Sequence, residues 1–394
     1  MKAGSSERTS PFRGRGHRPT RLLLVVDSLQ VGGAERQVVG LAVTLGRRGY
    51  EVVVACSVAG ELASLLEEAG VPVRPLMGRL VKRRVSPRYA LRLGRLMRGE
   101  RFDLVHAHIY ASAAAAALAA LGTGLPLVIT EHTEGTWQGW RARWVSRWVY
   151  RRVERLIAVS ASIRRRLLER DGVHPDLITI VPNAVTSPPE PRPDSLPPGL
   201  RESSLVGTVA RLQPEKGIES FLNAAARIAP LFPMARFVIV GDGPLREELA
   251  ALAEDLGLGD RLHFLGFRPD ASAVMGSLDV LVVPSLTEGS PLVTLEAMSA
   301  GIPIIASAVG GIPDQVLHGR DGLLVPPGDP GAIAEALISL LRDSARARRL
   351  GEAGRRRAAS LYSHETMVQQ IEAVYREVLG LPAASEVEEL GSVR

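Results

Sequence analysis

The pattern that decides the fold lies in residues 284–311, PSLTEGSPLVTLEAMSAGIPIIASAVGG. An apolar strand ends at Pro284, and after a short loop we expect a helix with Ser290 as its N-cap and Pro291 as its first residue. This helix stops before Gly301, after which a second apolar strand follows. A strand that leads through a helix into the next strand is the repeating unit of a parallel α/β sheet.

The same alternation of apolar runs and helical stretches continues in both directions along the chain. Continuous apolar strands separated by helices are typical of a parallel sheet that is covered on both faces, so each half is predicted to be a doubly wound α/β domain. The predicted strands occupy residues 21–27, 51–57, 71–76, 104–106, 127–131, 156–159 and 178–181 in the first half, and 205–210, 236–240, 262–265, 280–283, 304–306 and 322–325 in the second.

Composition marks the boundaries between segments. A proline-rich stretch without periodicity separates the two halves and is typical of a linker. The final helix either stays with the second domain or crosses back to the first. We predict a disordered basic tail over residues 1–20, an N-terminal domain over 21–185, a linker over 186–203, a C-terminal domain over 204–360, a C-terminal helix over 361–380 and a flexible tail over 381–394.

The single cysteine and the charge distribution exclude several classes of protein. One cysteine, Cys56, cannot form a disulfide framework and favours a reducing, cytoplasmic compartment. The longest apolar runs, 22–26 and 113–121, are far shorter than the roughly 20 residues of a membrane-spanning helix. Residues 1–200 hold 30 Lys and Arg against 17 Asp and Glu, whereas the remainder holds 18 against 25. We therefore expect only the first half to meet an anionic surface, and not nucleic acid, because no recognised motif or continuous basic stripe is present.

Two glutamates flank a predicted anion site in the second half. The free N–H groups of Leu292 and Val293, together with the flexible Gly289, can bind an anion at the start of the predicted helix. Glu288 lies just ahead of this helix and Glu296 about two turns along it. Carboxylates suit the recognition of hydroxyl groups because they accept hydrogen bonds readily. A helix cap and an exposed helical glutamate remain the alternative for each residue taken alone.

Further candidates follow other predicted strands. Arg211 and Lys216 lie five residues apart after the strand 205–210 and can converge on one pyrophosphate, because strand ends in open α/β sheets face the ligand-binding crevice. Gly241 follows the strand 236–240 in an Asp-Gly turn, which alone is a weak signal. In the first half, Gly32 and Gly33 allow close approach of a ligand to the backbone. They do not form G-x-G-x-x-G, so a dinucleotide site is not expected.

The second half also matches a known signature. Glu288 and Glu296 enclose seven residues and are followed by AMSAGIP and by Gly310 and Gly311. This pattern resembles the two-glutamate signature of glycosyltransferase family 4, a family of retaining enzymes, and the resemblance extends from residue 21 to about residue 379. It implies an α/β protein of the GT-B fold, with two doubly wound Rossmann-like domains that face a central cleft. The first domain would bind the acceptor and the second the nucleotide sugar.

The resemblance also implies roles for individual residues. The first glutamate of the family contacts donor-sugar hydroxyls and the second holds the nucleotide ribose, while the Arg/Lys pair neutralises the donor diphosphate. A histidine at the end of a strand lies near the reacting sugar, a position that His132 matches. The implied catalytic residues are His132, Arg211, Lys216 and Glu288, and the implied donor-binding residues are Gly32, Gly33, Gly241, Phe267, Gly289, Ser290, Leu292, Val293 and Glu296.

Two more histidines precede the site at His132. His106 and His108 are spaced i, i+2, so they lie on one face of a strand. A metal pair is conceivable, but without a third ligand nearby we favour a structural or acceptor-side role. The sequence has no Asp-x-Asp motif to hold a diphosphate-bound metal, and the expected cations already serve the anion. We therefore expect no metal and no cofactor.

The resemblance implies a hexosyl-type glycosyltransferase that moves a sugar from a nucleotide diphosphate sugar to a glycan or lipid-linked acceptor in cell-envelope or polysaccharide biosynthesis. UDP is the commoner nucleotide of the family. Two alternatives stay open, namely another GT-B enzyme, such as a nucleotide-sugar epimerase or a phosphorylase, and a catalytically inactive glycan-binding subunit.

A stripe of tryptophans suggests peripheral contact with a membrane. Tryptophan and arginine together are typical of the interface between water and lipid, although a helix with its aromatic face in the core is the alternative. Residues 88–98 repeat the pattern, with apolar residues on one side and Arg88, Arg92, Arg95 and Arg98 on the other. Our hypothesis is a cytoplasmic protein held at the inner face of an anionic membrane through residues 88–98 and 137–152, with the tryptophans Trp137, Trp140, Trp144 and Trp148 and the arginines Arg141, Arg143, Arg147, Arg151 and Arg152.

Overall fold

The computed structural model describes residues 18–81, 85–133, 139–185, 195–200 and 203–382. The chain divides into two compact units. Unit 1 comprises Met1–Val159, Arg164–Val181 and Glu365–Arg394, and unit 2 comprises Ser160–Ile163 and Pro182–His364. The two tails and the linker that the sequence predicts lie mostly outside the described residues.

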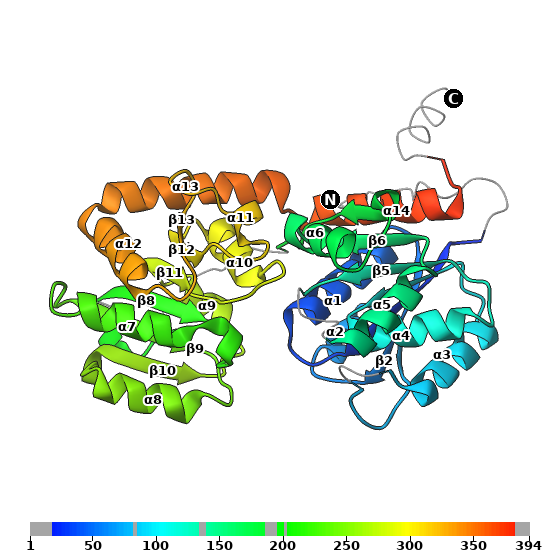
Figure 1. Cartoon of the computed structure of the whole chain (residues 1–394), viewed down its shortest axis with the longest axis horizontal. Helices are drawn as coiled ribbons and strands as arrows, with labels where there is room; N and C mark the ends of the chain where they lie inside the picture. The colour runs from blue at the N-terminus through cyan, green and yellow to red at the C-terminus, as the bar shows by residue number, and fades with distance from the viewer. Residues whose placement is uncertain (1–17, 82–84, 134–138, 186–194, 201–202, 383–394) are drawn as a thin grey trace, which may run out of the picture. The chain divides into compact units, whose positions relative to one another are not determined.

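Unit 1 contains a seven-stranded sheet in the order β3-β2-β1-β4-β5-β6-β7 (Figure 1). All neighbouring strands are parallel. The apolar residues 22–26 of β1, an interior strand, are fully buried, which explains why this strand is a continuous apolar run. The strands are β1 (Arg21–Ser28), β2 (Glu51–Val58), β3 (Val73–Pro75), β4 (Leu104–His108), β5 (Leu127–Glu131), β6 (Arg155–Ala158) and β7 (Ile178–Ile180), and the helices are α1 (Gly33–Arg47), α2 (Ala63–Glu68), α3 (Pro87–Gly99), α4 (Tyr110–Ala120), α5 (Trp140–Tyr150), α6 (Ala161–Glu169) and α14 (His364–Leu379).

Unit 2 contains a six-stranded parallel sheet in the order β10-β9-β8-β11-β12-β13. The strands are β8 (Ser204–Val209), β9 (Ala235–Val240), β10 (Leu262–Gly266), β11 (Val280–Val283), β12 (Ile304–Ser307) and β13 (Leu323–Val325), and the helices are α7 (Ile218–Ile228), α8 (Arg246–Asp255), α9 (Ala271–Met275), α10 (Leu292–Ala300), α11 (Ile312–Gln315), α12 (Pro330–Arg342) and α13 (Ser344–Leu361).

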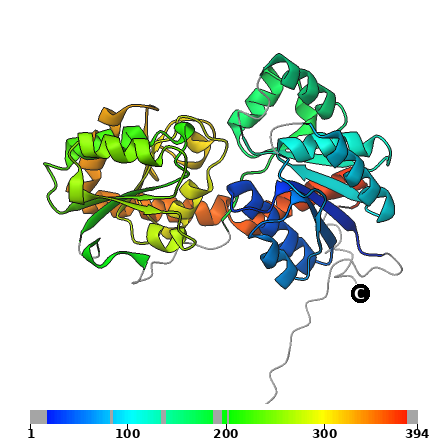
Figure 2. The same ribbon diagram turned by 90° about the horizontal axis from the view of Figure 1, so that it is seen from below.

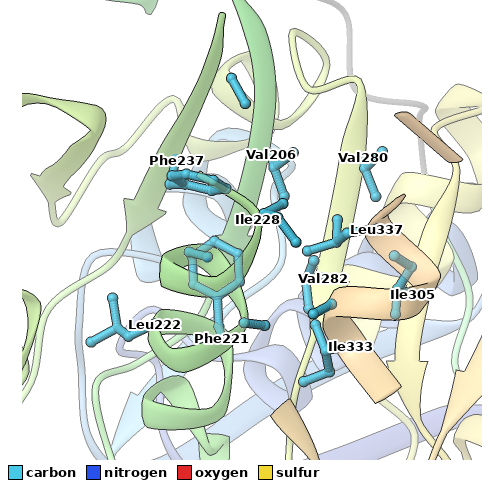
Figure 3. Packing of buried hydrophobic residues seen from close by; sticks show 14 of the residues in the cluster. Val206, Phe221, Leu222, Ile228, Phe237, Val280, Val282, Ile305, Ile333 and Leu337 are labelled. Carbon is cyan, nitrogen blue, oxygen red and sulfur yellow. The ribbon is translucent and has the colours of Figure 1, made fainter. Parts of the chain in front are cut away.

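Helices bury both faces of the unit 2 sheet. On one face Phe221 of α7 meets Phe237 of β9 edge to face, with ring centroids 6.3 Å apart, and Leu337 of α12 joins the same cluster (Figure 3). On the other face Leu295 and Met298 of α10 pack with the alternate residues of the strands. Side chains of successive strand residues point to opposite faces, so a strand between two helical layers must be apolar throughout.

The prediction of two doubly wound parallel α/β units is confirmed. Each of the thirteen strands in the described part of the chain overlaps a strand predicted from the sequence. Within the same residues, no helix is both long enough and apolar enough to cross a bilayer.

The last helix, α14, belongs to unit 1 although unit 2 precedes it in the chain (Figures 1 and 2). Tyr375 of α14 is fully buried, and its hydroxyl lies 2.6 Å from Nδ1 of His106 on β4. Arg48, just after α1, pairs with Glu365 and Glu372 of α14. Unit 1 is therefore completed by the C-terminal residues of the chain.

The predicted N-cap of the central helix is wrong. Helix α10 begins at Leu292, with Pro291 rather than Ser290 at the N-cap position and no side chain capping it. The Ser290 hydroxyl instead accepts a hydrogen bond of 2.9 Å from Nε2 of Gln315, a residue of α11. The predicted end of the helix is confirmed, because Gly301 takes the left-handed conformation that closes it.

Candidate functional site

Parallel strands of unit 2 end at one edge of the sheet, where two close backbone contacts fix the loops. A Cβ atom on Gly310 would lie 1.7 Å from the carbonyl oxygen of Glu288, and one on Gly217 would lie 2.3 Å from that of Pro284. Both glycines also have positive φ, 55° and 60°. Only glycine fits such positions, so the loops after β8, β11 and β12 meet backbone to backbone.

These contacts bring two of the sequence-predicted catalytic residues together. Lys216 Nζ lies 2.6 Å from Glu288 Oε1, and both side chains are largely buried. The hydroxyl of Ser285 donates a hydrogen bond of 2.7 Å to the same oxygen. No hydrogen bond or ion pair within the described residues uses the other oxygen, Oε2. The carboxylate is thus fixed through one oxygen and can accept a ligand hydroxyl through the other.

The backbone ahead of α10 is fixed from several sides. Asn183 Nδ2 donates a hydrogen bond of 2.8 Å to the carbonyl oxygen of Ser290, and both residues are buried. A Cβ atom on Gly311 would lie 2.2 Å from the carbonyl oxygen of Gly289. The N–H groups of Leu292 and Val293 lie in the first turn of α10, where they have no helical partner. They form a fixed donor group that suits an anion.

Other predicted donor-binding residues surround the same edge. Arg211 is exposed two residues after β8, and Glu296 is half-buried on α10. The backbone N–H of Gly241 donates a hydrogen bond of 2.8 Å to the carbonyl oxygen of Gly266, which joins the loop after β9 to the end of β10. Phe267 follows with 61% of its surface exposed. An exposed aromatic ring beside a fixed loop is suited to contact with a planar base.

The predicted residues of unit 1 lie after β1 and β5. Gly32 is the N-cap of α1 and Gly33 its first residue. A Cβ atom on Gly32 would lie 2.2 Å from Oε2 of Glu35, so that carboxylate covers the start of α1, where the sequence predicted close approach of a ligand to the backbone. A carboxylate at this place stabilises the positive end of the helix.

His132 directly follows β5 and belongs to a chain of buried polar groups. Its Nε2 lies 3.1 Å from Nδ1 of His108, and the ring of His108 lies 4.0 Å from that of His106. His106 in turn contacts Tyr375 and, at 2.7 Å through Nε2, Thr130. Burial lowers the pKa of His132 to about 4 and that of His106 to about 3. All three rings are neutral at pH 7.

Histidine neighbours of this kind raise the question of a metal. In the described ranges, no group of three or more His, Cys, Asp or Glu side chains is placed to hold a metal ion. Each nitrogen of His106 is already bonded to a hydroxyl group, by Tyr375 and by Thr130. His106 is therefore a structural residue, which agrees with one of the two roles expected for it.

Comparison with known proteins places both units in one family. The model described as Glycosyl transferases group 1 matches residues 198–357, and the model described as Glycosyltransferase Family 4 matches residues 31–187. The UDP-Gal:alpha-D-GlcNAc-diphosphoundecaprenol alpha-1,3-galactosyltransferase of Escherichia coli is 30% identical over 315 residues, which cover 75% of this chain and 81% of that protein. The alpha-maltose-1-phosphate synthase of Mycolicibacterium smegmatis is 31% identical over 311 residues, covering 71% of this chain and 80% of that protein. The chain belongs to glycosyltransferase family 4.

Solved structures agree with this assignment. The Anabaena protein Alr3699/HepE in complex with UDP-glucose has a TM-score of 0.81 and 24% identity, over 91% of this chain and 99% of that chain. The predicted GT-B fold is confirmed, and this family 4 chain is a glycosyltransferase of the hexosyl class. Two other curated relatives, 35% and 32% identical, are matched over only 20% and 48% of their own lengths.

The family 4 chain also contains a buried carboxylate that the sequence analysis did not single out. Asp27, near the end of β1, accepts hydrogen bonds of 2.8 Å from both the backbone N–H and the hydroxyl of Ser112 in the first turn of α4. Its other oxygen, Oδ2, is buried without a hydrogen-bond partner. Asp27 thus caps the first turn of α4. The residue just before this helix, Ile109, has a φ of 68°, which is sterically costly for a β-branched residue. Its place at the end of a strand was the signal available in the sequence.

An ion-pair network fixes helix α5 to the sheet. Arg166 of α6 lies 2.9 Å from Glu131 at the end of β5, and the Tyr150 hydroxyl of α5 donates a hydrogen bond of 2.9 Å to the same carboxylate. Trp140 and Trp144, one turn apart on the same helix, are 63% and 68% exposed. The alternative in which these two tryptophans pack in the core is therefore wrong.

The other residues of the predicted membrane contact are placed differently. Trp148 is half-buried with Arg152 stacked 4.0 Å from its ring, and Trp137 lies outside the described residues. In α3 the expected apolar membrane side is wrong, because Tyr89, Leu93 and Met97 are buried in unit 1. Arg88, Arg95 and Arg98 at the outer side of α3 are exposed, and so is Leu91.

Asp27 predicts a specific dependence of stability on pH. Burial raises its pKa from 3.8 to about 6, so between these pH values the folded state binds more protons than the unfolded state. The free energy of unfolding of the wild type, relative to Asp27→Asn, should therefore fall by about 3 kcal/mol as the pH rises from 4 to 7. Urea unfolding of both proteins along this range measures the difference. Asp176→Asn, at an exposed site, is the matched control, and parallel curves for the wild type and Asp27→Asn would contradict the assignment.

Proposed function

We propose that this family 4 glycosyltransferase transfers a hexose from a UDP-linked donor to a glycan or lipid-linked acceptor, with retention of anomeric configuration. The observation that carries the proposal is the fixed pair of Lys216 and Glu288 beside the free N–H groups of α10. A cation, a carboxylate with one free oxygen and a helix start are the three groups that a sugar linked to a diphosphate requires. Unit 2 would bind the donor, and unit 1 would bind the acceptor and contribute His132.

The proposed chemistry follows from these groups. Transfer breaks the bond between C1 of the sugar and the diphosphate oxygen and forms a bond from C1 to the acceptor oxygen. The departing diphosphate gains negative charge, which Lys216, Arg211 and the start of α10 would stabilise. The proton of the acceptor hydroxyl would pass to an oxygen of the leaving phosphate. Because these groups already supply positive charge, we propose that the reaction needs no metal ion.

The sugar and nucleotide would be held by the neighbouring residues. Glu288 Oε2 would accept a hydrogen bond from a sugar hydroxyl, and Glu296 would bind the ribose. The exposed ring of Phe267 is suited to contact the base. Relatives support the choice of substrates, because the Anabaena structures contain UDP and UDP-glucose, and the E. coli relative is named for a UDP-Gal donor and a diphosphoundecaprenol-linked acceptor.

Calorimetry with a panel of UDP-, GDP- and ADP-sugars tests the donor site. We expect a UDP-sugar to bind equally with and without EDTA, and to bind at least about 100-fold more weakly to Arg211→Ala/Lys216→Ala, because each contact between a side-chain cation and phosphate contributes about 1.5–3 kcal/mol. Arg236→Ala/Arg346→Ala removes the same charge from other parts of unit 2 and is the matched control.

Several results would contradict this proposal. Binding of no donor would favour the inactive glycan-binding subunit, and EDTA-sensitive binding would contradict metal independence. Release of UDP without any acceptor, or conversion of the donor into its epimer, would favour another GT-B enzyme.

We further propose that unit 1 contacts an anionic membrane through α5, which would bring the enzyme to a lipid-linked acceptor. The exposed Trp140 and Trp144 lie on a helix that also exposes Arg143 and Arg147. Exposed tryptophan beside arginine is the composition of a surface that inserts rings at the lipid headgroups and pairs cations with phosphates. The buried network at Glu131 keeps the helix rigidly on the sheet.

Vesicle sedimentation tests the membrane contact. The wild type should bind phosphatidylcholine vesicles that contain phosphatidylglycerol and should bind pure phosphatidylcholine much less. Trp140→Ala/Trp144→Ala should lower the partition coefficient at least about tenfold, because burial of one large apolar side chain contributes about 1.5–3 kcal/mol. Leu231→Ala/Met234→Ala removes two exposed apolar residues of unit 2 and should leave binding unchanged. Equal binding to vesicles with and without phosphatidylglycerol, or unchanged binding of Trp140→Ala/Trp144→Ala, would contradict the proposal.

A further inference from the structure

The carboxylate of Glu288 is fixed beside a cation that would bind the diphosphate. Its Oε1 lies 2.6 Å from Lys216 Nζ and accepts a hydrogen bond of 2.7 Å from the Ser285 hydroxyl. The side chain of Glu288 is only 10% exposed and that of Lys216 only 18%. Salt screens such a largely buried pair weakly, so both charges act on any ligand that binds next to them.

The backbone on both sides of this ion pair is also fixed. The carbonyl oxygen of Glu288 lies against Gly310, where a Cβ atom would be only 1.7 Å away. The N–H of Leu286 donates a hydrogen bond of 2.9 Å to the carbonyl oxygen of Glu215, which joins the loop after β11 to the short turn that ends at Lys216. The negative charge of Glu288 is therefore already in place when a ligand arrives.

Lys216 sets an upper limit on the distance between this carboxylate and a bound phosphate. A phosphate oxygen that pairs with Nζ lies about 2.8 Å from it. Because Glu288 Oε1 lies 2.6 Å from the same nitrogen, the two oxygens can be no more than about 5.4 Å apart. Negative charges at this separation repel each other strongly outside bulk water. If Lys216 instead left Glu288 to reach the phosphate, the carboxylate would lose its cation, which also weakens binding.

This repulsion is larger for free UDP than for a UDP-sugar. In a UDP-sugar the sugar esterifies the second phosphate, so each phosphate carries one negative charge. In UDP the terminal phosphate is free and carries a charge of about −1.5 to −2 at pH 7. A UDP-sugar also brings hydroxyl groups, which can donate to Glu288 Oε2 and offset the repulsion. After transfer the sugar is gone, and the carboxylate faces a more highly charged phosphate with no such compensation.

We propose that the charge of Glu288 makes this site discriminate between the sugar-linked diphosphate and the free one, so that it weakens the retention of the product UDP. The inference rests on the proposed transferase function and adds a role for Glu288 in product release. Release of product limits the turnover of many enzymes. A fixed carboxylate that opposes binding of the free diphosphate favours this step, while hydroxyl groups of the sugar restore the affinity for the donor.

Glu288→Gln removes the charge and keeps the shape of the side chain and an oxygen that can accept from Ser285. Calorimetry of the full chain with UDP and with UDP-glucose measures the effect. We expect Glu288→Gln to bind UDP at least about tenfold more tightly than the wild type, because the repulsion is removed. It should bind UDP-glucose no more than about threefold more tightly, or more weakly, because the hydrogen bond from the sugar loses its charged acceptor.

Glu247→Gln removes the same charge from an exposed position on α8 and is the matched control, for which both affinities should stay at the wild-type values. Binding of UDP to Glu288→Gln that is equal to or weaker than binding to the wild type would overturn the inference. Equal tightening of UDP and UDP-glucose would also overturn it, because the charge would then not discriminate between them. A wild type that binds neither ligand would contradict the proposed donor site itself, and the inference would fall with it.

Discussion

The arrangement of the loops in unit 2 depends on a position that only glycine can occupy. The carbonyl oxygen of Glu288 lies so close to Gly310 that a Cβ atom there would be 1.7 Å away, and Gly217 meets Pro284 in a similar way. These contacts draw three loops together at the carboxyl edge of the parallel sheet. The approach of Lys216 to Glu288 at 2.6 Å and the fixed entrance to α10 both follow from it. The charged groups are thereby held in place by the backbone before any ligand arrives, which is the condition for effective electrostatic stabilisation.

Unit 1 uses the same type of sheet with a different chemistry at its strand ends. Unit 2 presents charged side chains on glycine-rich loops, whereas unit 1 encloses three neutral histidines at the ends of β4 and β5. Desolvation keeps the histidines uncharged and raises the pKa of Asp27 to about 6. The chain returns through α14 to complete this region, because Tyr375 bonds to His106.

Much of this architecture could be predicted from the sequence, because long apolar runs between helices have few other solutions. The proximity of Glu288 and Lys216 could also be predicted, since both follow strands of one sheet. Features that depend on residues distant in the sequence could not be predicted. Ser290 was expected to cap α10, but its hydroxyl bonds to Gln315, which no local pattern indicates. Likewise, the apolar side of residues 88–98 resembles a membrane face in sequence and is part of the core, because amphipathicity alone does not say which surface a helix covers.

The central claim is that the edge built on Gly310 and Glu288 binds the nucleotide. Hydrogen exchange by mass spectrometry, on the full chain with and without saturating UDP, tests it most directly because it reports where the ligand protects the backbone. The account predicts slower exchange in peptides that cover residues 211–217 and 288–293, where backbone N–H groups and cations would surround the diphosphate. Unchanged exchange in both segments, with UDP bound and protection found only elsewhere, would contradict it.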